Sequence, residues 1–140
     1  MDSPEQLPFP LREHSIEIRV RYQETDAQGR VHHANYINYF EVARVEMLRA
    51  GGRNYRDLEL GGLFLVVVDV QCQYYGGAIY DDVLRVDIAV DWTKGTRIRH
   101  SYKIWRDQEL VAEGHTVVAS VSPEGKVLRL PKWLRGNGEV

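Results

Sequence analysis

The chain has 140 residues, enough for one compact domain that buries a sizeable core without metal or disulfide staples. Hydrophobic residues make up 44% and charged residues 27%, as in soluble globular proteins and unlike disordered chains. The 18 basic and 20 acidic residues give a formal net charge of −2, which argues against nucleic-acid binding by bulk electrostatics.

The start of the chain and its cysteine content favour a cytoplasmic protein. Residues 1–5 contain neither a basic nor an apolar segment, so no signal peptide is predicted. The longest apolar run, Leu63–Val68, is six residues and too short to span a membrane. Cys72 is the only cysteine, which excludes an internal disulfide and fits a reducing compartment.

The first predicted elements are a tail, a strand and a polar loop. Residues 1–14 hold three of the five prolines and show no periodic pattern, so they are predicted to form the tail. From Ile16 to Tyr22, apolar and polar residues alternate as in a half-buried strand. The loop runs from Gln23 to Asn35. We expect a single domain over residues 15–135 and a short tail at 136–140.

A buried helix is predicted next, over Tyr36–Ala50. At about 100° per residue, one arc of this helix carries no polar residue. The arc contains Tyr36, Tyr39, Phe40, Ala43, Met47 and Ala50. Asn35 is the predicted N-cap, and Gly51 ends the helix. A helix that is apolar over much of its circumference is expected to be wrapped by other structure.

The remaining pattern predicts a second short helix at Asn54–Leu60, four strands and a helical turn near Pro131–Leu134. The strands are predicted at Leu63–Tyr75, Val83–Trp92, Ile98–Arg106 and Leu110–Val121. Short connections favour an antiparallel meander of these four strands. With the strand before the helix, this gives an α+β fold in which a sheet of about five strands curls around one long helix.

The loop before the long helix carries the residues suited to chemistry. It places the carboxylate of Asp26 beside a helix N-terminus, where free N–H groups stabilise an anion. A carboxylate next to an oxyanion-binding helix end can perform acyl transfer. The alternative is a structural loop, with an Asx turn at Asp26 and Asn35 as a cap.

This loop resembles the signature of the 4-hydroxybenzoyl-CoA thioesterase-like branch of the hotdog-fold acyl-CoA thioesterases. The matching positions are Tyr22, Thr25–Gly29, Val31–His33 and Asn35–Tyr36. Tyr39–Arg44 resembles the start of the family's central helix, and Tyr80–Asp82 resembles a second recurrent element. Gln28 departs from the pattern, which prefers a small residue there. The likeness runs from about Ile16 to Lys132.

The resemblance implies a five-stranded antiparallel sheet wrapped around the helix, and homodimers or homotetramers with active sites between subunits. It implies hydrolysis of an acyl-CoA without metal or organic cofactor. Asp26 matches the catalytic nucleophile or general base, and His33 matches the residue whose backbone N–H binds the thioester carbonyl. Gly29, Asn35 and Tyr36 match substrate-binding positions of the same motif.

Basic residues follow on the later strands, where the family binds the phosphates of coenzyme A. Our candidates are Arg97, Arg99 and Arg129, and the alternative for each is a solvated strand face.

The sequence also allows other catalytic residues and other functions. Glu41 is the second candidate for the catalytic acid, and His33 with Glu41 would suit a dehydratase-like protein. A protein that binds acyl groups, an acyl-carrier-protein thioesterase and a non-enzymatic partner protein are further alternatives. Adjacent His32 and His33 rarely ligate one metal, so no metal site is expected. Cys72 lies within an apolar strand and is expected in the core rather than as a nucleophile.

Overall fold

The computed structural model describes residues 11–135, in which five strands form one sheet. The strands are β1 (Glu13–Arg19), β2 (Phe64–Tyr74), β3 (Val83–Lys94), β4 (Arg97–Arg106) and β5 (Glu109–Val121). The helices are η2 (Tyr22–Glu24, a 3₁₀ turn), α1 (His33–Ala50), α2 (Tyr55–Leu60) and α3 (Lys132–Arg135). Within residues 11–135, no helix is both long enough and apolar enough to cross a membrane.

The first strand begins earlier than the sequence pattern predicts. β1 starts at Glu13, inside the predicted tail, and ends at Arg19 instead of Tyr22. Its residues alternate between exposed and half-buried side chains, and it pairs antiparallel with β3. The rest of the predicted N-terminal tail, up to residue 10, and the predicted tail at 136–140 lie outside the described residues.

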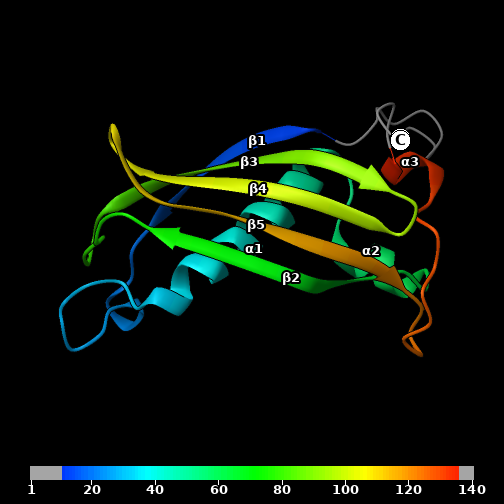
Figure 1. The fold of residues 1–140 in the computed structure, drawn as a ribbon, viewed down its shortest axis with the longest axis horizontal. Helices are drawn as coiled ribbons and strands as arrows, with labels where there is room; N and C mark the ends of the chain where they lie inside the picture. The colour runs from blue at the N-terminus through cyan, green and yellow to red at the C-terminus, as the bar shows by residue number, and fades with distance from the viewer. Residues whose placement is uncertain (1–10, 136–140) are drawn as a thin grey trace.

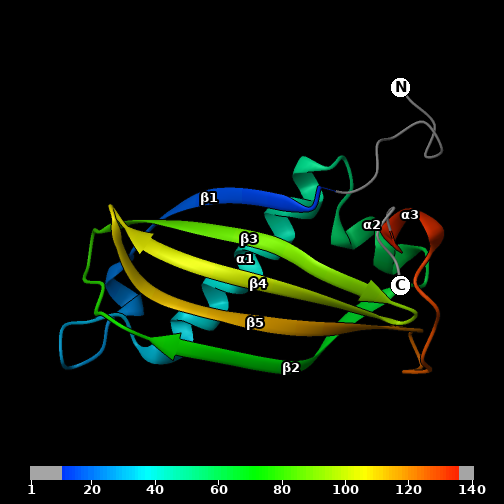
Figure 2. The same cartoon turned by 45° about the horizontal axis from the view of Figure 1, so that its top comes forward.

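The sheet is antiparallel with the strand order β1-β3-β4-β5-β2 (Figure 1). β3, β4 and β5 form the predicted meander, but β2 does not join it beside β3. It pairs instead with β5 at the far edge of the sheet. The segment between β2 and β3 therefore passes across one end of the sheet, as Figure 2 shows. Ala78 in this segment is fully buried, so the crossing closes that end of the core.

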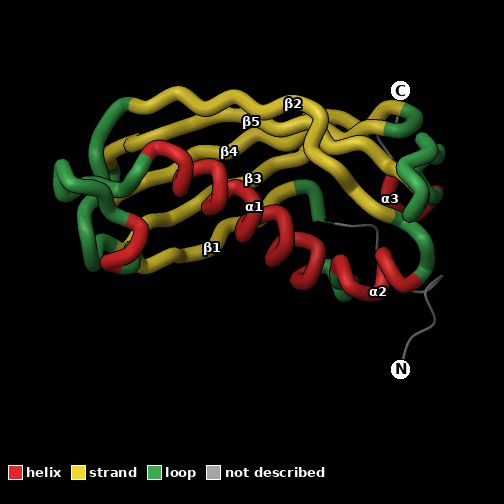
Figure 3. The backbone as a smooth tube through the Cα atoms, turned by 90° about the horizontal axis from the view of Figure 1, so that it is seen from below, coloured by secondary structure: helices red, strands yellow, loops and turns green. Residues whose placement is uncertain are grey.

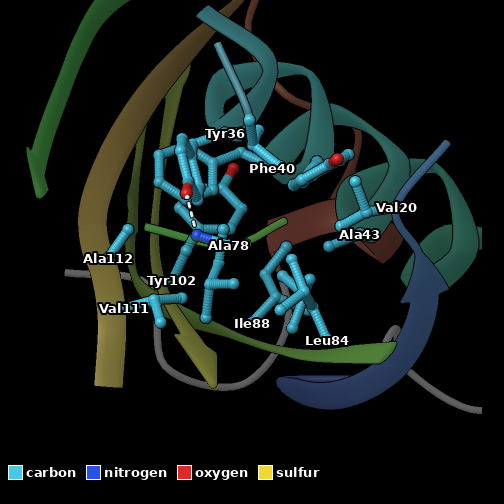
Figure 4. Packing of buried hydrophobic residues seen from close by; sticks show 14 of the residues in the cluster. Val20, Tyr36, Phe40, Ala43, Ala78, Leu84, Ile88, Tyr102, Val111 and Ala112 are labelled. Atoms are coloured by element: carbon cyan, nitrogen blue, oxygen red, sulfur yellow. Dashed lines mark hydrogen bonds between the residues drawn. The ribbon is translucent and has the colours of Figure 1, made fainter. Parts of the chain in front are cut away.

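α1 lies along the inner face of the curved sheet, as expected for a hotdog fold (Figure 3). The apolar arc predicted for this helix is buried from Tyr36 to Met47, but Ala50 in the last turn is exposed. Phe40 stacks on Tyr102 of β4, with ring centroids 4.2 Å apart (Figure 4). Buried side chains from β3 and β4 complete this core: Leu84, Val86, Ile88 and Ile104.

The N-terminus of α1 differs from the prediction. The helix begins at His33 and is capped by His32, whose Nδ1 accepts a hydrogen bond from the Ala34 N–H at 3.1 Å. Asn35, the predicted cap, lies inside the first turn. Its side-chain amide donates to the Glu24 carbonyl oxygen at 2.9 Å. The period of the apolar residues could not reveal this extra turn, because His33 and Ala34 are both exposed.

β2 is an edge strand with an irregularity at Val68. Its register with β5 shifts between Val67 and Asp69, so Val68 is an extra, unpaired residue. The bulge reverses the alternation of faces. Val66 therefore does not share a face with Val70, Cys72 and Tyr74 as the sequence pattern predicts.

Candidate active site

Asp26 lies in a tight turn between η2 and α1. Its N–H donates to the Arg30 carbonyl oxygen and its own carbonyl accepts from the Gly29 N–H, both at 2.9 Å. Gly29 has φ +77°, in the left-handed region that favours glycine, so this residue allows the chain to turn here. One Asp26 carboxylate oxygen, Oδ1, accepts from the Gln28 N–H at 2.9 Å. Oδ2 has no hydrogen-bond partner within residues 11–135.

A buried carboxylate, that of Glu24, holds the turn in place, and it was not predicted from the sequence. Glu24 is only 9% exposed, and its Oε1 accepts from the Arg21 N–H at 2.8 Å and from the Tyr39 hydroxyl at 2.9 Å. Its carbonyl oxygen accepts from the His32 N–H at 2.9 Å. Glu24 therefore ties the Asp26 turn to the first turn of α1 and to a buried side chain of the helix.

The N-terminus of α1 keeps a free donor. The His32 side chain satisfies the Ala34 N–H, but the His33 N–H has no acceptor in the described part of the chain. The His33 carbonyl oxygen accepts from the Tyr74 hydroxyl at 2.9 Å, and the two rings meet edge to face at 6.5 Å. Burial, followed by a hydrogen bond with Cys72, raises the pKa of Tyr74 to about 12. Tyr74 is thus a neutral donor beside the free N–H.

Tyr36 and Asn35, predicted to bind substrate, both have structural partners in this chain. The Tyr36 hydroxyl accepts from the Ala78 N–H at 3.1 Å, and burial raises the pKa of this phenol. Tyr36 therefore holds the segment between β2 and β3 against α1. The Asn35 Oδ1 accepts from the Asn38 side-chain amide at 2.9 Å.

The predicted phosphate-binding residues lie away from Asp26 in the same chain. Arg97 begins β4, at the end of the sheet opposite the 26–33 loop (Figure 1). Arg99 faces outward on the same strand, where its Nε donates to Asp91 Oδ2 at 3.0 Å. Arg129 lines a surface hollow of about 450 Å³ with Trp133. The structure therefore does not bring these three arginines together with Asp26 within one chain.

Two other arginines lie at the Asp26 end and were missed by the sequence analysis. The Arg30 side chain packs against Gly77, where an added Cβ would lie 2.7 Å from Arg30 Cδ. Arg106 donates to the Gly77 carbonyl oxygen at 2.9 Å and to Asp82 Oδ2 at 3.0 Å. The sequence signal available for Arg106 was the Tyr80–Asp82 element, whose Asp82 accepts from Arg106 in the structure.

The remaining candidates lie elsewhere. Glu41 is exposed on α1, eight residues after His33 and so about 12 Å further along the helix axis. Cys72 packs against the core, where burial raises the pKa of its thiol. The rings of His32 and His33 stack with centroids 4.1 Å apart. No cluster of metal-ligating side chains is found among residues 11–135.

Comparison with known proteins places this chain in a family of thioesterases. The family model described as the Thioesterase-like superfamily matches residues 20–137, which include the whole fold from the end of β1 onward. The chain belongs to the thioesterase-like superfamily. As a member of it, the protein is a thioester hydrolase. The narrower resemblance to the 4-hydroxybenzoyl-CoA thioesterase-like branch stays a prediction.

Relatives within this superfamily cover nearly the whole chain. The acyl-CoA thioester hydrolase YbgC of Escherichia coli O6:H1 is 33% identical over 117 residues, covering 82% of this chain and 87% of its own. A solved structure from Aquifex aeolicus has a TM-score of 0.82 at 36% identity, covering 85% of this chain and 94% of its own. The DHNA-CoA thioesterase of Staphylococcus aureus has a TM-score of 0.81 at 31% identity, covering 84% and 80%. The hotdog fold predicted from the sequence is confirmed.

Proposed function

We propose that this protein hydrolyses the thioester bond of an acyl-CoA, with Asp26 as the catalytic carboxylate and the His33 N–H as the oxyanion donor. The observation that carries this proposal is the turn that holds Asp26 beside a helix N-terminus with a free N–H group. The relatives named as acyl-CoA thioesterases support the substrate class.

Two routes are compatible with this arrangement. In the first, Asp26 takes a proton from water as the water oxygen attacks the thioester carbonyl carbon. In the second, the Asp26 carboxylate attacks the carbon itself, and water then hydrolyses the resulting anhydride. In both, negative charge develops on the carbonyl oxygen, where the His33 N–H and the dipole of α1 would stabilise it. The C–S bond then breaks, and CoA leaves as the thiolate, which takes up a proton.

We further propose that the active form is a homodimer, or a tetramer of two such dimers, paired through β2. This strand forms one edge of the sheet, with unpaired backbone groups on one side. It also exposes several apolar side chains. Val66, Val67, Val68 and Val70 are each at least 40% exposed. An exposed apolar edge strand of this length is expected to be covered in solution.

Antiparallel pairing of β2 with β2 of a second copy would also complete the candidate site. It places the Phe64 end of one strand beside the Tyr74 end of the other, and Tyr74 contacts His33. The end of the sheet that carries Arg97 and Arg129 would then approach the Asp26 loop of the other copy. In this arrangement the arginines predicted to bind the CoA phosphates would serve the active site of the other copy. Within one chain they are distant from Asp26.

The test is a panel of thioesters assayed by release of free thiol. The panel contains hydroxybenzoyl, dihydroxynaphthoyl and short aliphatic acyl groups, each carried by CoA and by acyl carrier protein. We expect hydrolysis of at least one CoA thioester. Hydrolysis of carrier-protein thioesters alone would replace CoA as the carrier. Absence of any hydrolysis by folded protein would favour an acyl-binding, dehydratase-like or interaction role.

Oligomerisation has a separate test. Light scattering at micromolar concentration should give a mass that is a multiple of 16.2 kDa and at least twice that value. Val67→Lys places a charge on the apolar edge of β2 and should lower the mass, whereas Lys103→Glu on the exposed outer face should not. A mass near 16.2 kDa for the unmodified protein would contradict the proposed dimer.

A further inference from the structure

A small cavity lies beneath the C-terminal half of α1, away from the Asp26 loop. Its volume is about 40 Å³, and its walls come from α1, α2, the sheet and α3. Most of its lining is apolar. The polar lining residues are Arg12, Arg44, Tyr55, Thr93 and His100, and the lining includes no aspartate or glutamate. Arg44 follows His33 by eleven residues, or about 16 Å along the helix axis.

The first unusual feature of this cavity is a buried cation without a counter-charge. Arg44 is only 9% exposed. Its NH1 group donates to the Tyr102 hydroxyl at 3.0 Å, and that hydroxyl is also hydrogen-bonded to Thr116 at 2.6 Å. No carboxylate lies within ion-pair distance of Arg44 among residues 11–135. A buried guanidinium that contacts only neutral groups is costly, because its charge has left water without gaining an opposite charge.

The second unusual feature is a buried imidazole with an unused ring nitrogen. His100 is 6% exposed, and its Nδ1 has no hydrogen-bond partner within the described residues. Burial, together with the charges of Arg44 and Arg12, lowers the pKa of His100 to about 3. The imidazole is therefore neutral at physiological pH. The ring carries no positive charge of its own, and its unpartnered Nδ1 can donate a hydrogen bond to an anion when the ring proton is on that nitrogen.

We propose that this cavity binds one small monovalent anion, a halide or a carboxylate of formate size, held by Arg44 with His100 beside it. An anion would offset the charge of Arg44 and offer an acceptor to the imidazole. The size of the cavity limits the ligand. A buried water needs roughly 10–15 Å³ of such volume, so about 40 Å³ admits an ion of a few atoms but not a phosphate ester of CoA size.

The site would stabilise the fold rather than take part in thioester hydrolysis. The site joins α1, α2 and the segment before β1 to β4, so an ion there would add to the Arg44–Tyr102 hydrogen bond that already links α1 to β4. The inference does not rest on the proposed function, and its test measures no enzymatic activity.

The first test is thermal unfolding at constant ionic strength, with sodium formate replacing sodium gluconate, whose anion is too large for the cavity. Above its dissociation constant, each tenfold rise in formate should raise the Tm by about 4 °C. Arg44→Gln should abolish this dependence. Arg85→Gln is the matched control, because Arg85 is exposed on the outer face and pairs with Asp87 at 3.1 Å. A Tm of the unmodified protein that does not depend on formate or chloride would overturn the proposal, as would an equal response in Arg44→Gln.

The second test uses the unmodified protein and covers the case in which Arg44→Gln does not fold. Histidine ring resonances are followed by NMR during titration with formate, chloride and gluconate at constant ionic strength. The His100 resonances should shift in a saturable way with formate or chloride and not with gluconate. His115, which pairs with Asp69 of β2 at 3.3 Å and does not line the cavity, serves as the internal reference. Unmoved His100 resonances would exclude an anion at this site.

Discussion

The hydroxyl of Tyr39, in the middle of α1, donates a 2.9 Å hydrogen bond to Glu24 Oε1, two residues before Asp26. Tyr39 is 1% exposed, and its burial, together with this hydrogen bond, raises the pKa of its phenol. This contact joins the buried face of the helix to the turn that carries the candidate carboxylate. The position of Asp26 therefore depends on the core as well as on the loop's own hydrogen bonds.

Tyr39→Phe tests this connection. The change removes the donor and leaves a buried carboxylate with one partner fewer, at a cost of about 1.5–3 kcal/mol in unfolding free energy. We expect a lower midpoint in urea and a lower kcat with little change in KM, because Asp26 is positioned less well. Tyr22→Phe is a suitable control, since Tyr22 is 77% exposed. An unchanged kcat would show that Glu24 holds the turn without help from the helix.

Asp26→Asn tests the catalytic carboxylate. The amide can still accept the 2.9 Å hydrogen bond from the Gln28 N–H, so the turn should persist. An amide is neither a general base nor a nucleophile, so turnover should fall by at least about 100-fold. Thiol-release kinetics and the Tm are measured together. Near-normal turnover in folded protein would remove Asp26 from the mechanism and make Glu41 the leading candidate.

A pair of substitutions at His33 separates backbone from side-chain chemistry. His33→Ala keeps the N–H group and should keep much of the activity. His33→Pro removes the donor, which should cost about 100- to 1,000-fold if this N–H binds the oxyanion. His33 is the first residue of α1, where proline is well tolerated.

The backbone of His32, the residue before the new proline, is also compatible with this substitution. His32 already has φ −60° and ψ 138°, the extended conformation that a following proline requires. Circular dichroism spectra and melting curves should therefore be close to those of the unmodified protein. If the alanine variant is as inactive as the proline variant, the imidazole itself takes part, and the dehydratase-like use of His33 with Glu41 gains support.

Gly114→Ala tests the packing between α1 and β5. A Cβ at Gly114 would collide with the Gln71 carbonyl oxygen of β2 and approach Phe40 to 3.0 Å. The strands or the helix must shift, which should cost about 1–3 kcal/mol or more. Gly61→Ala is the control, because a Cβ there meets its nearest atom at 3.4 Å. Equal melting temperatures for the two variants would contradict this account of the contact.

His100 predicts a pH dependence of stability. Its pKa is about 3 in the folded protein, lowered by burial and by the charges of Arg44 and Arg12, against a usual value near 6.5. Two neutral phenols, Tyr55 and Tyr102, face the same region. Because the unfolded state binds the proton more tightly, stability is complete above about pH 6.5 and falls toward pH 3. The slope is at most about 1.4 kcal/mol per pH unit.

The measurement compares urea unfolding of the unmodified protein and His100→Phe between pH 4 and pH 8 in gluconate buffer. The variant lacks this titration, so its stability should fall less steeply below pH 6.5. Parallel curves would show that His100 is not buried as a neutral group. Lower pH also protonates carboxylates in both proteins, and the difference between the curves removes that shared contribution.

Local pattern was sufficient for most of the fold. Alternation of apolar and polar residues located β3, β4 and β5, and the apolar arc located α1. The position of β2 at the far edge was not predictable in this way. It depends on the pairing of β2 with β5, two strands that lie far apart in the sequence. The face reversal at Val68 likewise depends on pairing with β5.

In the candidate site, too, local sequence signals were predictable and long-range contacts were not. Asp26, Gly29 and His33 all lie within the short segment 26–33, so one motif could suggest them together as candidates. The contact between Glu24 and Tyr39 was not predicted, because a charged residue and an aromatic residue fifteen positions apart give no periodic signal. The helix cap was misplaced for a similar reason. His32 is an uncommon cap, and Asn35 matches the usual cap residues while its amide in fact bonds to the Glu24 carbonyl.

The pairing of β2 with β5 also sets the order in which the sheet can form during synthesis. β3, β4 and β5 are joined by short turns and can pair as soon as they emerge from the ribosome. β2 emerges before all three, yet its partner begins only at Glu109. Until then the valine-rich segment from Val66 to Val70 has no strand on either side. Chains that stop between residues 75 and 108 are therefore expected to aggregate, whereas chains extending past Val121 can bury this strand's inner edge.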